Sequence, residues 1–457
     1  MNYYFSRLLK LLVLLFLLAM LNLAQADKAT LANINQTINQ YPENIKLFVN
    51  KNFTSSQIYS PNFKNKLETK FFYYYFSPWQ KPFLFQSING AKEEEIADIS
   101  IYLKSPGWIE NKQQNSLENI KKINTNMNLS SLSQHQSEKG IIVHETNLRV
   151  LPTDKPIFGN WREAGEGFPF DNMQEALLKA NLPVFILGSS KDGAWKLVST
   201  PDNDLGWVNS LDVAFVDQNF IHRWAQSKHF IIATEDNVAL LDPEQRYYLS
   251  TRIGELFPLV EINKNHYWIK IVVRDEDGIG RTHIVRISKN AGHLFPLTAS
   301  PRYIAKMISK MQNTPYGWGE LFGYRDCSAT TKDLFSIFGF WLPRNSSAQA
   351  KEGGKEINLA NLTPLEKINV IRQKAIPFYS LLSMPGHIML YIGEKDGKLW
   401  IFHSPWGLHT MNSKTNKEGR AIIGRSVITP LDFGSTFENV KSDYLTKITG
   451  LTLLLNS

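Results

Sequence analysis

The C-terminal third of the chain carries a helical pattern of apolar residues followed by strand patterns. Residues 299–311, ASPRYIAKMISKM, place five large side chains on one face of a helix: Tyr303, Ile304, Met307, Ile308 and Met311. Two apolar runs follow, GHIMLYIG (386–393) and LWIFH (399–403), with Asp396-Gly397 between them as a hairpin signal. Helices followed by an antiparallel hairpin predict an α+β domain over residues 297–457.

Two segments in the middle of the chain look like distant copies of each other. Residues 138–216 contain LPVFILGSS, AWKLVST and GWVN, and residues 217–296 contain ELFPLVEI, YWIKIVV and THIVRI. Trp195 precedes Gly206 by 11 residues, and Trp268 precedes Gly280 by 12. Short strands rich in β-branched and aromatic residues predict two small β-barrels that arose by duplication.

The segment before them, residues 27–137, is rich in polar residues and is expected to be mainly helical. Helix-like patterns cover 33–50 and 116–127, and the polar stretch 124–140 is typical of a linker. An aromatic cluster, FFYYYFSPWQKPF (71–83), is expected in a core or an inter-domain contact.

The first 26 residues have the composition of a secretory signal peptide. Arg7 and Lys10 precede an apolar run over 11–23, which ends in Ala24-Gln25-Ala26. The run is shorter than the roughly 20 residues that span a bilayer. We therefore expect cleavage before Asp27, no stable membrane anchor afterwards, and a periplasmic or secreted protein. An uncleaved anchor is the alternative, and a lipoprotein is excluded because no cysteine follows the run.

Composition and charge add little to the prediction of function. The chain has 457 residues, 43% of them hydrophobic and 20% charged, which is typical of globular domains. Its formal charge of +8 falls to +6 without the leader. A basic surface suits acidic partners such as anionic lipid, nucleic acid or cell-wall carboxylates, and a solvated surface without a partner explains it equally well.

The single cysteine, Cys327, is the strongest candidate for chemistry. In an exported chain an unpaired cysteine is either buried and inert or reactive. Asp326 or Ser328 would begin a helix here, which places Cys327 in the first turn. Backbone N–H groups and the helix dipole at this position are expected to lower the thiol pKa from roughly 8.5 toward neutrality.

Two histidines are the candidate base and its partner. His387 begins one predicted strand and His403 ends the next. If a five-residue loop, 394–398, joins the strands, Met389 lies opposite His403, and the two histidines become diagonal neighbours on one face. His387 would then accept the proton of the thiol and His403 would orient it. A four-residue loop would place them on opposite faces.

Other chemistries find no support in the sequence. No C-x-x-C or H-E-x-x-H motif occurs, so we predict neither a metal site nor a cofactor. Walker and Rossmann fingerprints are absent, and the basic residues follow no nucleic-acid-binding motif.

Several motifs, in order, resemble the NlpC-type cell-wall cysteine peptidases. They are PYGWGELFGYRDCSATTKDLFSIFGFWLPRNSSAQ, GHIMLYIG, FHSPWG and EGRAIIGRSVITPL, within residues 300–435. Upstream, TNLRVLP, FPFDNMQEALLKANLPVFILGSSKDGAWKLV and GWV resemble the SH3-like domains attached to such peptidases. SPWQKPF resembles their N-terminal stabilising domain.

The resemblance implies a papain-like fold for the C-terminal domain and a Cys327–His387–His403 triad. It also implies hydrolysis of the γ-D-glutamyl–meso-diaminopimelate bond of peptidoglycan stems, particularly stems with a free N-terminal L-Ala. Matching positions suggest four residues that contact substrate: Tyr316, Asp326, Ser328 and Ser346. Glu320 stands where the YGWGG-type motif often has glycine, which leaves the shape of that loop open.

Two other functions remain open at this stage. A retired peptidase fold with two SH3-like units would bind cell wall without cleaving it. The same thiolate would also serve an amidase or an acyltransferase.

Overall fold

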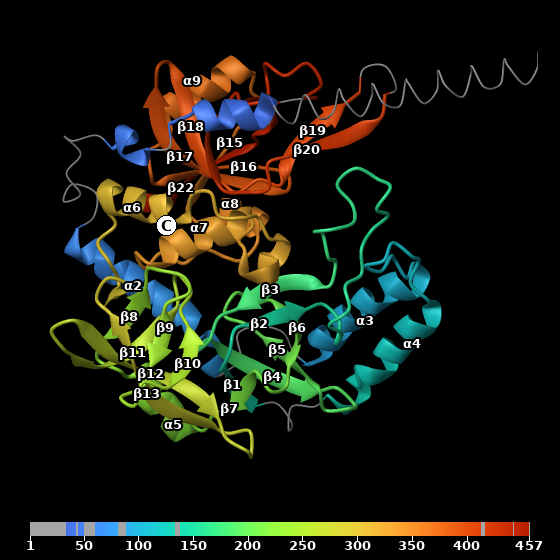
Figure 1. Cartoon of the computed structure of the whole chain (residues 1–457), viewed down its shortest axis with the longest axis vertical. Coiled ribbons are helices and arrows are strands. Elements are labelled where there is room, and N and C mark those ends of the chain that lie inside the picture. Colours follow the sequence, from blue (N-terminus) through green and yellow to red (C-terminus); the bar gives the residue numbers. More distant parts are fainter. Residues whose placement is uncertain are drawn as a thin grey trace, which may run out of the picture.

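The computed structural model describes residues 33–42, 44–49, 60–80, 88–132, 138–412, 416–441 and 443–456. Figure 1 shows an N-terminal helical part, two β domains and a C-terminal α+β domain, as the sequence predicts. The expected leader lies outside the described residues. Among the residues described, no helix has the length and apolarity needed to cross a membrane.

The N-terminal part divides between two surfaces of the molecule. Residues 33–40 are helical. The other elements are η1 (Ile45–Phe48), α2 (Pro61–Tyr75), η3 (Ser77–Trp79), α3 (Ile88–Lys104), α4 (Leu117–Asn126) and η4 (Leu129–Ser131). Tyr41 and Phe48 pack their rings on Trp400 of the C-terminal domain. Helices α3 and α4 lie beside the first β domain (Figure 1).

The predicted linker over 124–140 is wrong in its described part. Helix α4 continues to Asn126, and Met127 and Leu132 are buried in the core that α3 and α4 share with the first β domain. Their apolar side chains cover Trp195 and Trp207, which explains why this polar stretch is folded.

The two β domains have the same topology. The first contains β1 (Glu138–Ile142), β2 (Thr146–Arg149), β3 (Gln174–Leu178), β4 (Pro183–Ser189), β5 (Trp195–Ser199), β6 (Leu205–Asn209) and β7 (Val213–Phe215). The second contains α5 (Gln218–Ala225), β8 (Phe230–Ala233), β9 (Ala239–Leu241), β10 (Tyr247–Ser250), β11 (Leu256–Ile262), β12 (His266–Arg274), β13 (Gly280–Ser288) and β14 (Gly292–Leu294). The strand orders β3-β2-β6-β5-β4-β1-β7 and β10-β9-β13-β12-β11-β8-β14 correspond one to one. Trp195 and Trp268 therefore lie on equivalent strands, as the predicted duplication requires.

The C-terminal domain packs helices against a six-stranded antiparallel sheet. Its helices are α6 (Pro301–Met311), η6 (Trp318–Gly323), α7 (Cys327–Ser336), α8 (Ser346–Glu352), α9 (Pro364–Lys374), α10 (Tyr444–Lys447) and η7 (Leu454–Asn456). Its strands are β15 (Lys355–Asn358), β16 (Ser380–Met384), β17 (His387–Lys395), β18 (Lys398–His403), β19 (Gly407–Met411), β20 (Glu418–Ile422), β21 (Val427–Pro430) and β22 (Gly450–Leu453). The sheet order is β15-β22-β16-β17-β18-β21, and β19 and β20 form a separate hairpin.

Helix α6 confirms the predicted apolar face with one exception. Ile304, Met307, Ile308 and Met311 are buried, but Tyr303 is 48% exposed. Tyrosine carries a polar hydroxyl that tolerates solvent, so the helical pattern alone did not distinguish it from its buried neighbours.

Helix α2 joins the domains through the predicted aromatic cluster. The ring of Phe71 lies 4.8 Å from that of Phe295 and 5.4 Å from that of Trp341. The Trp79 indole donates to the backbone carbonyl of Gly140 at 2.8 Å. One buried apolar cluster contains residues of all four domains, including Cys327. The described part of the cluster is thus both core and inter-domain contact, and the nucleophile candidate sits in the shared core.

Candidate active site

Cys327 is the first residue of α7. Asp326 is the N-cap: its backbone is extended, and its Oδ1 accepts from the backbone N–H of Ala329 at 2.8 Å. This confirms the predicted helix start and the capping role of Asp326. The thiol is only 8% exposed.

The expected pKa of Cys327 is wrong in direction. Burial and then the charge of Asp326 together raise the pKa of the thiol to about 12, while backbone N–H groups of Ile388 and Ser328 act in the opposite sense. The capping carboxylate places a negative charge at the helix end that was expected to stabilise a thiolate. Cys327 therefore rests as a neutral thiol at pH 7.

The two histidines contact each other, and His387 lines the same cavity as Cys327. His387 begins β17 and His403 ends β18, and His387 Nε2 lies 2.8 Å from His403 Nδ1. His403 Nε2 lies 3.2 Å from Thr429 Oγ1. Because Nε2 of His387 is engaged, Nδ1 is the ring nitrogen left to exchange a proton with the thiol.

The histidines share a face for a reason other than the predicted five-residue loop. The turn is the two-residue Asp396-Gly397, with φ of 53° and 74°. A register shift between Tyr391 and Gly393 then leaves Ile392 as an extra residue in β17. The bulge restores the pairing Leu390–Phe402, so the next residues along, Met389 and His403, fall opposite each other.

Burial keeps both imidazoles neutral. It lowers the pKa of His387 to about 4, against a smaller raising effect of Asp326, and it lowers the pKa of His403 well below its ordinary value. The Tyr444 ring packs on both imidazoles. Its centroid lies 5.9 Å from that of the His387 ring and 4.9 Å from that of the His403 ring. A neutral thiol beside a neutral imidazole favours proton transfer during attack.

Cys327 and His387 open onto one cavity of about 320 Å³. Four rings form much of its wall: Phe170, Tyr316, Trp318 and Trp406. They contact one another in sequence, with centroids of Tyr316 and Trp406 5.7 Å apart and those of Phe170 and Trp318 5.3 Å apart. Phe170 belongs to the first β domain, so the cavity is built by two domains.

Of the four residues expected to contact substrate, Tyr316 alone lines this cavity. Asp326 accepts from Arg344 Nη2 at 2.8 Å, and the Ser328 hydroxyl accepts from Arg344 Nη1 at 2.9 Å. Ser346 begins α8 and does not line the cavity. Contacts of Asp326, Ser328 and Ser346 with substrate therefore remain predictions.

Glu320, the departure from the family motif, has a defined place. Its backbone is left-handed, with φ of 64°, the conformation that glycine adopts most readily. Its buried carboxylate lies 3.1 Å from Arg344 Nε. Arg344 is thus paired with both Glu320 and Asp326, two residues of the approach loop, the segment 317–326 that precedes Cys327.

The first β domain holds that approach loop in position. Arg149 binds Asp171 and Gln174, at 2.8 and 2.9 Å. The Gln174 side chain then donates to the backbone carbonyl of Gly319 at 2.9 Å, and the Gly319 N–H donates to Asp326 Oδ2 at 3.1 Å. A continuous hydrogen-bond chain therefore leads from this domain to the residue beside Cys327.

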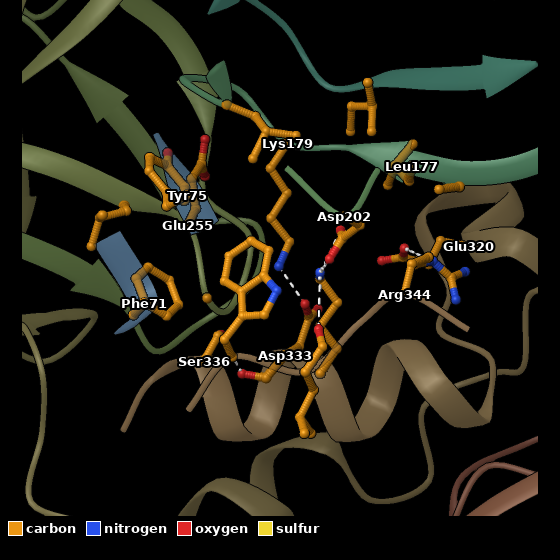
Figure 2. Close-up of a pocket in the computed structure, with 18 of the residues that line it drawn as sticks. Phe71, Tyr75, Leu177, Lys179, Asp202, Glu255, Glu320, Asp333, Ser336 and Arg344 are labelled. Atoms are coloured by element: carbon orange, nitrogen blue, oxygen red, sulfur yellow. Dashed lines mark hydrogen bonds and ion pairs between the residues drawn. The ribbon is translucent and has the colours of Figure 1, made fainter. Parts of the chain in front are cut away.

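Ion pairs at the junction of the domains fix Asp333, a buried residue of α7. Figure 2 shows Lys179 of the first β domain pointing at Asp333 of α7, and Arg344 beside Glu320. Arg325 also binds Asp333 at 2.6 Å and reaches Asp236 of the second β domain at 2.7 Å. Both β domains thereby anchor the helix that carries Cys327.

Sequence reasoning missed the residues that come from distant segments. Phe170, Thr429 and Tyr444 reach the site only through tertiary contacts, so no local motif indicated them. Among the described residues, no cluster of three or more His, Cys, Asp or Glu side chains is suited to hold a metal ion.

Family comparisons assign all four parts of the chain. The NLPC_P60 N-terminal stabilising domain matches residues 9–132, an SH3 domain of SH3b1 type 156–209, an SH3 domain of SH3b2 type 217–261, and the NlpC/P60 family 313–420. No match was found among curated proteins.

Comparison with solved structures found the following similarities. An NlpC/P60 endopeptidase from Photobacterium damselae subsp. piscicida has 26% identity and a TM-score of 0.80, over 91% of this chain and 98% of that one. An NlpC/P60 family protein from Bacillus cereus has 17% identity and a TM-score of 0.48, over 70% of this chain and 100% of that one.

Proposed function

The chain carries the domain set of the multidomain NlpC/P60 cysteine peptidases, and from this premise we propose that it hydrolyses peptide stems of peptidoglycan. The proposed bond joins γ-D-glutamate to a diamino acid, meso-diaminopimelate. The observation that carries the proposal is the cavity shared by Cys327 and His387, with His403 hydrogen-bonded behind His387.

The proposed reaction starts from a neutral Cys327 thiol and a neutral His387 imidazole. As the substrate carbonyl approaches Cys327, the thiol proton passes to Nδ1 of His387 and the sulfur forms a bond to the carbonyl carbon. The first-turn N–H groups of α7 are suited to stabilise the oxyanion. His387 then gives its proton to the leaving amine, and the C–N bond breaks to leave a thioester.

The second half of the cycle releases the acid product. His387 takes a proton from water, the resulting hydroxide attacks the thioester, and the C–S bond breaks. The proton returns to sulfur, which regenerates the neutral thiol and imidazole. His403 accepts from Nε2–H of His387 through its Nδ1 and donates from Nε2–H to Thr429, so it keeps His387 in the required tautomer.

The size of the cavity supports a short peptide as the substrate. Its volume of about 320 Å³ is at the lower end of ligand sites, which span roughly 300–1,000 Å³. Stems with a free N-terminal L-Ala remain part of the proposal. Asp326, one of the residues expected to contact substrate, already accepts from Arg344, Ser328 and two backbone N–H groups. Any contact with the amine must therefore displace one of these donors or use another group.

Export to the periplasm or the medium belongs to the same proposal, because peptidoglycan lies outside the inner membrane. It rests on the leader-like residues 1–26. A protein that binds cell wall without cleaving it is the weaker alternative, since Cys327 and His387 line one cavity and His403 contacts His387.

Product analysis by mass spectrometry tests the proposal. L-Ala-γ-D-Glu-diaminopimelate and intact sacculi would be incubated with the wild type and with Cys327→Ala. Release of L-Ala-γ-D-Glu from the tripeptide by the wild type alone is the expected result. No product from either protein would favour the wall-binding alternative, and cleavage by Cys327→Ala would exclude the thiol mechanism.

A further inference from the structure

One wall of the catalytic cavity is basic. Arg420 on β20, Lys447 at the end of α10 and His409 on β19 line the same cavity as Cys327. None of them takes part in the triad, and although Arg420 lies within the motif EGRAIIGRSVITPL, the sequence assigned none of them a role.

In the described part of the chain, neither Arg420 nor Lys447 forms an ion pair. Among the described residues, no carboxylate oxygen lies within 4 Å of the Arg420 guanidinium or the Lys447 ammonium group. Arg420 donates to the backbone carbonyl of Gly419 at 3.0 Å. The neighbouring acids are already engaged: Glu418 binds Lys441 and His409, and Asp443 caps α10 through the N–H of Thr446.

The charge of Arg420 disfavours the charged form of Lys447. Burial and then the charge of Arg420 lower the pKa of Lys447, with Asp443 acting in the opposite sense. The backbone of the first β domain also approaches Arg420, since a Cβ atom added at Gly165 would lie 2.9 Å from its Nη2. Gly165 has a φ of 89°, and the missing side chain leaves room for the guanidinium. An anion in the cavity would relieve the repulsion.

The position of this wall indicates which part of the substrate it faces. His387 must hand its proton to the leaving amine, so the leaving residue lies on the histidine side of the cavity. Tyr444 packs on the ring of His387, and Lys447 follows Tyr444 by three residues, one turn along α10. The basic wall therefore flanks the leaving residue rather than the residue acylated on Cys327.

We propose that Arg420 and Lys447 form a carboxylate-binding subsite for the leaving residue of the substrate. This inference rests on the proposed function and adds a determinant of specificity to it. Guanidinium and ammonium groups recognise carboxylates by charge-assisted hydrogen bonds. Two sources supply such a carboxylate: the side chain of a diamino dicarboxylic acid, or the α-carboxylate of a leaving residue that ends the stem.

The test compares four tripeptides of the form L-Ala-γ-D-Glu-X. X is diaminopimelate, diaminopimelate amidated on the side-chain carboxyl, diaminopimelate amidated on the α-carboxyl, or L-lysine. Calorimetry would measure their affinity for Cys327→Ala, and kcat/KM would be measured with active protein. Loss of the recognised carboxylate is expected to weaken both by about 10- to 100-fold, the usual range for hydrogen bonds between charged groups.

Variants identify the residues responsible. Arg420→Gln and Lys447→Met, each also combined with Cys327→Ala for binding, should lose most of the preference for the carboxylate and leave the amidated peptide little changed. Lys417→Met is the matched control, because Lys417 is an exposed cation of the same hairpin outside the cavity. Which amide loses affinity separates the two sources of the carboxylate.

The outcomes separate this subsite from the reaction itself. Cleavage of all four peptides at equal rates would overturn the subsite and leave the proposed function intact. Carboxylate-dependent binding without turnover would support the subsite and count against the proposed reaction. Equal weakening of acid and amidated peptides in the variants would show that Arg420 and Lys447 act on folding or on the cavity as a whole, which also overturns the subsite.

Discussion

His387 Nε2 and His403 Nδ1 are 2.8 Å apart, although the hairpin that carries them turns through only two residues. The extra residue Ile392 in β17 makes this contact possible. With the register found next to the turn, His403 would face Leu390 and the two histidines would lie on opposite faces of the sheet. The bulge therefore aligns the proposed base with its proposed orienting partner, a role that bulges have near active sites.

The orienting role of His403 predicts different effects for two substitutions. His403→Ala removes the acceptor for His387 Nε2–H and should lower kcat by about 10²- to 10⁴-fold, the scale reported for an orienting residue in a triad. His403→Asn supplies an amide oxygen and should recover a large part of that loss. Steady-state kinetics decide the matter, with far-UV circular dichroism as the check on folding. Equal loss in both variants would contradict an orienting role.

The buried histidine predicts an unusual acid limb in the pH profile. The proposed mechanism requires neutral His387, and burial lowers the pKa of this residue to about 4. Activity should therefore persist as pH falls from 6.5 to 5 and decline only as pH approaches 4. The measurement is kcat/KM against pH with a small stem peptide. A half-maximal point near 6.5 would show that His387 is solvated and not held neutral by burial.

The same group makes stability depend on pH in a defined direction. Below pH 6.5 the unfolded chain protonates His387, while the folded protein does not until pH nears 4. The unfolded state then binds more protons, so the free energy of unfolding decreases as pH falls through this window. Denaturant titrations should show a smaller decrease in His387→Gln. An identical slope in both proteins would exclude this contribution.

The packing of Phe71 predicts that the N-terminal domain contributes strongly to the stability of the other domains. Its ring is buried against Phe295 and Trp341, so Phe71→Ala should cost about 3–5 kcal/mol of unfolding free energy. Tyr73→Ala is the control on the same helix, because Tyr73 is 48% exposed. Chemical denaturation compares the two. Similar small losses would show that α2 does not hold the domains together.

Two substitutions of Glu320 separate the effect of its charge on stability from the effect of its backbone conformation. Glu320→Ala removes a buried partner of Arg344 and keeps a Cβ atom in a left-handed backbone, for a loss of about 3–5 kcal/mol. Glu320→Gly removes the same charge, but glycine adopts the left-handed backbone conformation without strain. The glycine variant should therefore be about 1 kcal/mol more stable than the alanine variant. Denaturation curves of both provide the test, and an alanine variant as stable as the glycine variant would contradict it.

Much of this architecture can be predicted from local patterns, because they reflect local physics. The duplication was visible in the Trp195–Gly206 and Trp268–Gly280 spacings, which correspond to equivalent strands. The helix start at Cys327 followed from its capping residue. A bulge has no comparable sequence pattern. The same-face arrangement of the histidines was therefore predicted from a five-residue loop, whereas the structure has a two-residue turn and a bulge.

The remaining errors come from tertiary structure. The thiol pKa was predicted from the helix end alone, but burial of Cys327 and the charge of Asp326 determine its direction. Arg344, 18 residues along the chain from Asp326, donates to the carboxylate of Asp326, which was expected to contact substrate. Phe170, Arg420 and Lys447 enter the cavity from three separate segments. Sequence patterns indicate which residue reacts but not which residues surround it.

Cleavage in H₂¹⁸O tests the central claim most directly. L-Ala-γ-D-Glu-diaminopimelate would be incubated with the wild type in labelled water, and the products analysed by tandem mass spectrometry. The account predicts one ¹⁸O atom in the γ-carboxylate of the released L-Ala-γ-D-Glu, unlabelled diaminopimelate, and no release by Cys327→Ala. Label at another carboxylate, transfer of the acyl group to an added amine without labelling, or release by Cys327→Ala would contradict it.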